Sequence, residues 1–173
     1  MITTYRRAAA TLERIPDLPL LLARLTLGVL FIDHGLQKYN AQGGLASFEG
    51  FLRSLKNVPA PTLTSHVVPL LEVAGGALLI AGLLTRIFAV LLAGEMVVTG
   101  FVVKAHDLHQ PLVSTQGAGV ELDLVFLTLL VTVLLLGPGR ASIDRLLGLE
   151  RGPASNYDLA AKEPTARRAT QSI

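Results

Sequence analysis

The sequence contains no cysteine and no tryptophan, and charged residues are scarce. The absence of cysteine from the 173 residues excludes a disulfide framework, a cysteine-ligated metal site and dithiol redox chemistry by this chain. Charged residues make up 16% of the chain, whereas soluble domains carry about 25%. Hydrophobic residues make up 51%. This combination predicts a membrane protein.

Four long apolar stretches interrupt the polar parts of the chain. They run from Leu18 to Gln37, from His66 to Leu84, from Ile87 to Val103 and from Val120 to Leu136. Each is long enough to cross the hydrocarbon core, which needs roughly 17 to 25 residues. Buried helices of a soluble bundle would each show a polar face at helical spacing. The third and fourth stretches show no such face, so the sequence favours transmembrane helices.

The connections between these stretches differ in kind. The long link between the first and second stretches carries apolar residues at helical spacing, which predicts a short interfacial helix. Its apolar residues are Leu45, Phe48, Phe51, Leu52 and Leu55. The second and third stretches are separated by a very short link and must form a tight antiparallel hairpin. The third and fourth stretches are joined by a polar, glycine-containing link.

The predicted fold is an all-α, four-transmembrane-helix antiparallel bundle over residues 18–149. Residues 1–17 form an N-terminal segment, and residues 150–173 form a basic C-terminal tail that its composition predicts to be disordered. Lys and Arg outside the stretches lie mostly in these two segments and at Arg86. The positive-inside rule therefore predicts a multi-pass protein of the bacterial cell (inner) membrane with both termini in the cytoplasm.

Ionisable residues within or at the ends of the stretches are the candidate functional groups. A charge inside a span costs at least about 2.5 to 3.5 kcal/mol on insertion scales and is normally paired or faces a polar cavity. We expect Glu72, His34 and Lys38 to lie together as a site for proton transfer or quinone contact. Further polar residues should gather in the same half of the bundle, namely Glu121, Asp123 and His106. The alternative is that these groups only form structural ion pairs.

A second pairing is predicted nearer the other side of the membrane. If the first and third spans start at Leu18 and Ile87, Arg24 and Glu95 lie at depths that differ by roughly 3 Å. We therefore expect a structural ion pair between Arg24 and Glu95. His106 and His109 are spaced for one metal ion but lie in a polar loop, so no metal site and no haem are predicted. No dinucleotide fingerprint follows a predicted strand.

Several segments, in this order and spacing, resemble the DoxX family of small four-helix membrane proteins. They run from Arg24 through Gly28, Phe31, His34 and Gly35 to Lys38, from Glu72 through Gly82 to Arg86, and from Gly119 and Glu121 to Gly137-Pro138-Gly139-Arg140, Ser142 and Asp144. The resemblance covers about residues 20 to 145. It implies membership of a group linked to membrane redox chemistry, in which some relatives are subunits of thiosulfate:quinone oxidoreductase. Others associate with superoxide dismutase and a sulfurtransferase.

The resemblance and the membrane charges together leave three functional hypotheses. The first is a subunit or accessory of a membrane redox system with a quinone as cofactor. The second is a non-catalytic anchor or assembly partner of a larger complex, and the third is a small proton-coupled transporter. The expected partners are the lipid bilayer and other redox subunits or further copies of the chain, with no nucleic acid. Whether the chain is itself an enzyme stays open at this stage.

Overall fold

The computed structural model describes residues 17–115, 117 and 119–150, and all regular elements within them are helices. In chain order these are α2 (Leu18–Asn40), α3 (Gly44–Ser54), α4 (Pro61–Ala81), α5 (Thr85–Val97), the π-helix η1 (Val98–Asp107), α6 (Val120–Leu136) and α7 (Ile143–Leu146). The predicted all-helical class is confirmed for these residues. The N-terminal segment up to residue 16 and the tail from residue 151 lie outside the described residues.

Within the described part of the chain, three helices are long and apolar enough to cross a membrane. They are Leu18–Asn40, Pro61–Ala81 and the continuous α5–η1 segment Thr85–Asp107. The fourth predicted stretch is helical over the predicted bounds, with 17 residues in α6. Its crossing of a membrane stays a prediction.

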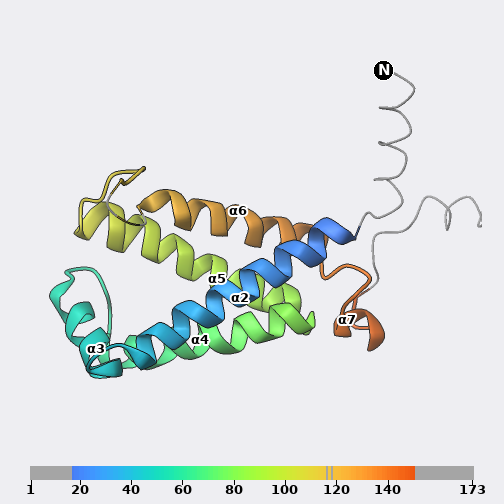
Figure 1. The fold of residues 1–173 in the computed structure, drawn as a ribbon, viewed down its shortest axis with the longest axis horizontal. Helices are drawn as coiled ribbons and strands as arrows, with labels where there is room; N and C mark the ends of the chain where they lie inside the picture. Colours follow the sequence, from blue (N-terminus) through green and yellow to red (C-terminus); the bar gives the residue numbers. More distant parts are fainter. Residues whose placement is uncertain (1–16, 116, 118, 151–173) are drawn as a thin grey trace, which may run out of the picture.

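The helices form two long antiparallel hairpins that diverge toward one end (Figure 1). α2 packs along α4, and α5 with η1 packs along α6. At the narrow end, α4 turns into α5 at Gly82, which has a positive φ of 67°. α7 lies at this same end. α3 and the link between η1 and α6 lie at the wide end (Figure 1).

The two largest differences from the predicted helix boundaries are at the start of α4 and at the end of the third span. α4 begins at Pro61, five residues before the predicted start, because proline is well suited to the first turn of a helix, where its missing N–H is not needed. The third span continues beyond Val103 to Asp107 as a π-helix, which apolar length alone does not predict. π-helical segments are rare and occur frequently at functional sites.

The core of the narrow half is apolar and joins both hairpins. Leu27 and Phe31 of α2, Leu79 of α4, Leu92 of α5 and Leu130 of α6 are all buried in one cluster. The outer faces of the same helices carry many exposed leucine and valine side chains. Such a surface is suited to contact with lipid rather than water.

Candidate functional site

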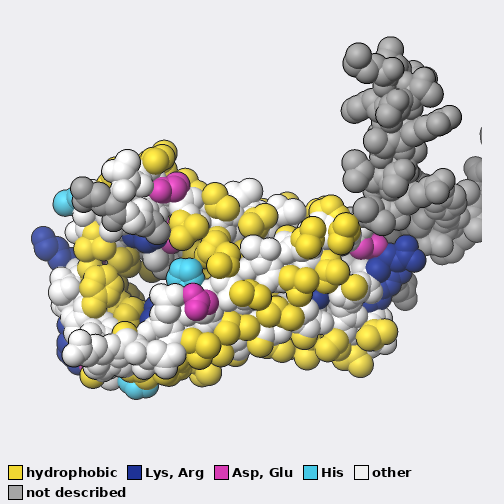
Figure 2. Space-filling view, viewed as in Figure 1, with side chains coloured by type: hydrophobic (Ala, Val, Ile, Leu, Met, Phe, Trp, Pro, Cys, Tyr) yellow, Lys and Arg dark blue, Asp and Glu magenta, His cyan; other side chains and the backbone are white. Residues whose placement is uncertain are grey.

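A cavity of about 750 Å³ lies between the two hairpins in the wide half of the molecule. All four long helical segments, α3 and the two links contribute to its lining. Most of the lining is apolar, including Phe31, Phe48, Phe51 and Phe126. Polar lining comes from His34, Lys38, Glu72, Glu95, Lys104, Gln110 and Asp123. The space-filling view shows a hollow in this half of the molecule (Figure 2).

Lys38 and Glu72 form an ion pair at the cavity wall. Lys38 Nζ donates to Glu72 Oε1 and Oε2 at 2.6 and 2.5 Å. The Glu72 side chain is only 3% exposed and that of Lys38 21%. The sequence-predicted grouping of Lys38 with Glu72 therefore exists in the fold, and both oxygens of this carboxylate are already occupied.

His34 and four phenylalanines form the aromatic part of the wall. The rings of Phe31 and Phe126 have centroids 5.5 Å apart, and the His34 ring meets Phe126 edge-on at 5.9 Å. His34 Nδ1 lies 2.8 Å from the Leu30 carbonyl oxygen. Because a carbonyl oxygen can only accept a hydrogen bond, Nδ1 carries the proton in this contact. The Lys38 ammonium lies 5.5 Å from the Phe48 ring centroid. The ring contacts close the cavity between α2 and α6.

A second ion pair, which the sequence analysis missed, comes from the other hairpin. Lys104 Nζ lies 2.7 Å from Asp123 Oδ2, with side chains 17% and 7% exposed. Lys104 also donates to the carbonyl oxygen of Gly119. Lys104 belongs to η1 and Asp123 to α6, and the close approach of Gly100 to the Asp123 side chain brings these elements together. A lysine at the end of an apolar stretch usually extends its ammonium group to the membrane surface. Nothing in the sequence therefore indicated that Lys104 pairs with Asp123.

The predicted Arg24–Glu95 ion pair is wrong. The Arg24 guanidinium, buried at the narrow end, donates to the backbone carbonyls of Leu79, Ile80, Pro138 and Ala141. α5 begins at Thr85 rather than Ile87, so Arg24 is six residues and Glu95 ten residues into their helices, roughly 6 Å apart in depth. The free carbonyls at the end of α4 attract the cation instead.

Glu95 lines the cavity together with Glu72 and does not pair with Arg24. Glu72 and Glu95 are therefore two carboxyl groups on the wall of one cavity. Glu95 Oε2 is buried without a hydrogen-bond partner. Glu95 lines the cavity together with Gly94, beside which a Cβ atom would meet no atom within 4 Å. Glu95 was predicted to form a structural ion pair, but in the structure it belongs to the polar part of the cavity wall.

Of the predicted outer cluster, only Asp123 lines the cavity. Glu121 Oε1 accepts a hydrogen bond from the Ser114 backbone N–H, within the link between η1 and α6. His106 lies on the outer surface with Asp107, 3.1 Å away, and both contact Asn57 of the link between α3 and α4. These Asn57 contacts join the two hairpins across the wide end. Among the described residues, no group of three or more His, Asp or Glu could hold a metal ion.

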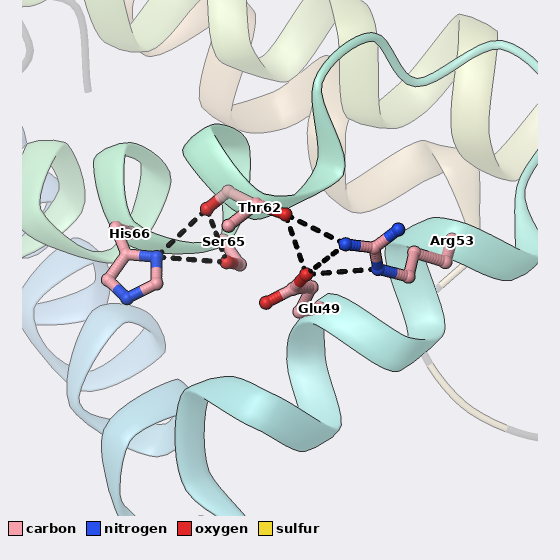
Figure 3. A network of polar contacts seen from close by, with 5 residues as sticks. All are labelled: Glu49, Arg53, Thr62, Ser65 and His66. Atoms are coloured by element: carbon pink, nitrogen blue, oxygen red, sulfur yellow. Dashed lines mark hydrogen bonds and ion pairs between the residues drawn. The ribbon is translucent and has the colours of Figure 1, made fainter.

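A polar network fixes α3 to the start of α4 beside the cavity (Figure 3). Arg53 donates to Glu49 at 2.6 Å and to the Thr62 hydroxyl at 2.9 Å, and the Thr62 hydroxyl donates to Glu49. These hydrogen bonds hold the pKa of the Glu49 carboxyl below its usual value, the Thr62 hydroxyl having the largest effect and Arg53 the next. The network positions Phe48 and Phe51 of α3, which line the cavity.

Comparison with known proteins identifies similar membrane proteins. The family model described as DoxX matches residues 19–105. The Escherichia coli K12 protein named "Inner membrane protein YqjF" is 30% identical over 79% of this chain and 97% of its own length. The Mycobacterium tuberculosis "Uncharacterized membrane protein Rv3486" is 35% identical over 72% of this chain and 78% of its own length.

A third relative has a name that refers to an activity. The Bacillus subtilis protein named "Putative oxidoreductase CatD" is 36% identical over 42% of this chain and half of its own length. No solved structure matches the chain. The matched residues 19–105 include Lys38, Glu72, Glu95 and Lys104 of the cavity, whereas Asp123 lies beyond them.

Proposed function

We propose, for a chain that belongs to the DoxX family of membrane proteins, that its cavity binds a quinone as part of a membrane redox system. The observation that carries this proposal is the composition of the cavity. It joins a large apolar, aromatic volume to two ion pairs whose carboxylates are buried. Sites for amphiphilic small molecules combine these two features. In this arrangement the quinone ring lies among the phenylalanines and its oxygens lie toward the polar groups.

The size of the cavity supports the same ligand class. A volume of about 750 Å³ lies within the range of about 300 to 1,000 Å³ that is usual for small-molecule sites. Lys38 and Glu72 face the cavity from one hairpin, and Lys104 and Asp123 face it from the other. The name of the relative CatD favours the redox assignment over the transporter and the assembly partner.

The proposed membrane arrangement follows from the same helices. α6 crosses the bilayer as a fourth span beside α5, and α3 lies at the interface with its apolar side on the cavity. Both ends of the described chain lie at the narrow end, where Asp17 pairs with Arg140. The excess of Lys and Arg in the terminal segments supports a cytoplasmic location for this end.

Binding of decylubiquinone to the purified full-length chain in lipid nanodiscs tests the proposal. The expected result is saturable binding that Gly94→Phe weakens at least tenfold, because the added ring occupies the opening of the cavity. Gly50→Phe is the matched control, since Gly50 also has no atom within 4 Å of its Cβ position but does not line the cavity. Absence of binding, or equal binding by both variants, contradicts the proposal.

The redox role and the assembly role have a separate test. Complexes isolated from native membranes with a tagged chain are examined by mass spectrometry for bound quinone and partner chains. Quinone together with an oxidoreductase subunit is the expected result. Stoichiometric partners without quinone favour the assembly role, and recovery of the chain alone without quinone contradicts both.

A further inference from the structure

The charged groups of the cavity do not balance. Lys38 pairs with Glu72, and Lys104 pairs with Asp123. These two pairs come from different hairpins and each is formally neutral. Glu95 is a third carboxyl group on the same cavity, and among the described residues no Lys, Arg or His forms an ion pair with it. One carboxyl group is therefore left without a cation.

The groups around Glu95 determine whether its carboxyl group is ionised or protonated. Glu72 and Glu95 line the same largely apolar cavity, and two carboxyl groups that share such a site disfavour each other's ionisation. Both oxygens of Glu72 already accept from Lys38 Nζ, which stabilises Glu72 as the anion. Glu95, which forms no ion pair with a cation among the described residues, is therefore the carboxyl group that holds a proton.

The other polar groups around the cavity do not change this assignment. His34 on α2 makes its Nδ1 contact with the Leu30 carbonyl. Lys104 on η1 is engaged by Asp123 of α6 and the Gly119 carbonyl. Ionised Glu95 would lie beside an existing carboxylate in a largely apolar cavity, an arrangement that is costly without a compensating cation.

We propose that Glu95 is a protonated carboxylic acid in the ligand-free cavity and donates its proton in a hydrogen bond to a carbonyl oxygen of the ligand. Glu72, held as the anion by Lys38, is the negative charge on the same cavity that disfavours ionisation of Glu95. The unpartnered Oε2 atom leaves Glu95 free to meet a ligand without breaking an existing contact. This inference rests on the proposed quinone site for its ligand, but the protonation of Glu95 does not depend on it.

Infrared spectroscopy of the protein in nanodiscs at neutral pH tests the protonation directly. Wild type should show the carbonyl-stretch band of a protonated carboxylic acid, and Glu95→Gln should lose it. Glu49→Gln is the control and leaves the band unchanged, since Glu49 pairs with Arg53 outside the cavity. A missing band in wild type, or one that persists in Glu95→Gln, overturns the proposal.

Chemical labelling of the unmodified protein gives the same information without a variant that could misfold. Dicyclohexylcarbodiimide reacts with protonated carboxyl groups in apolar surroundings. Peptide mapping should locate the adduct on Glu95. An adduct on Glu72 alone, or no adduct, overturns the assignment.

The ligand contact is tested by adding decylubiquinone to the same samples. A shift of the Glu95 band at saturating quinone supports donation to the ligand, and an unshifted band in a protein that binds quinone overturns the contact. A wild-type protein that binds no quinone overturns the proposed function and the ligand contact together. The infrared band still decides the protonation of Glu95 in that case, so the two failures are distinguishable.

Discussion

Gly28 of α2 and Gly76 of α4 face each other with almost no space between their backbones. A Cβ atom added to either residue would lie 2.6 Å from the carbonyl oxygen of the other. Backbone atoms cannot move aside as a flexible side chain can. The contact between α2 and α4 therefore depends on glycine at both positions, as is common where membrane helices pack closely.

Gly76→Ala should destabilise the protein by about 1 to 3 kcal/mol, the usual cost of overpacking. Thermal unfolding in detergent measures the change. Gly50→Ala is the matched control, because it adds the same methyl group to a helix where nothing lies within 4 Å. The control should be neutral or slightly stabilising, since alanine is favoured over glycine in helices by roughly 0.5 to 1 kcal/mol. Equal stability of the two variants would contradict the role of the close contact.

Replacing Arg24 should open the narrow end of the bundle. Arg24→Met removes the donor to four backbone carbonyls, and each buried acceptor left unpaired costs about 1 to 3 kcal/mol. We expect a large fall in the unfolding temperature together with faster amide exchange around Gly82. Arg53→Met is the control, since that side chain is 61% exposed. An effect no larger than that of the control would contradict a stabilising role for the hydrogen bonds of Arg24.

These two cases show what the sequence could predict and what it could not. Small residues such as Gly28 and Gly76 are common where membrane helices pack closely, but the sequence alone did not pair these two glycines. Depth along the chain suggested Glu95 as the partner of Arg24, but it could not show that the end of α4 and the Gly137–Gly139 turn present carbonyl oxygens to the cation. Depth also does not say which way a side chain turns about its helix. The pair Lys38–Glu72 was predictable because both residues lie toward the same end of the first hairpin.

The π-helix η1 shows a second limit of prediction from the sequence. η1 is a π-helix, and it presents Lys104 to Asp123 and the cavity. Hydrophobic periodicity is read at the α-helical repeat, so a change of helix type within an apolar stretch leaves no signal. The ion pair that completes the cavity from this side was therefore missed.

Asp144 holds the turn between α4 and α5 from the C-terminal part of the chain. Its carboxylate accepts from the backbone N–H groups of Leu84 and Thr85, at 2.7 and 2.9 Å, where α5 begins. Asp144→Ala should cost about 0.5 to 2 kcal/mol, as for loss of a helix cap. Unfolding in detergent measures it, and Asp33→Ala serves as control because Asp33 contacts only the exposed Gln37 side chain in the described hydrogen bonds. A smaller effect at residue 144 than at residue 33 would contradict the capping role.

The Glu49 network predicts a pH response of α3. The pKa of Glu49 is lowered in the fold, first by the Thr62 hydroxyl and next by Arg53. A lowered folded-state pKa means that the network stabilises α3 above the pKa of the unfolded state and that this contribution is lost as pH falls through the folded value. In Thr62→Val the pKa of Glu49 should rise toward its usual value, which carboxyl-carbon NMR titration measures. Amide exchange in α3 should then increase at a higher pH than in wild type.

Because Thr64 instead donates to the Pro59 carbonyl, Thr64→Val should leave the Glu49 titration unchanged. Coincident titrations of wild type and Thr62→Val would show that the hydroxyl does not set the Glu49 charge.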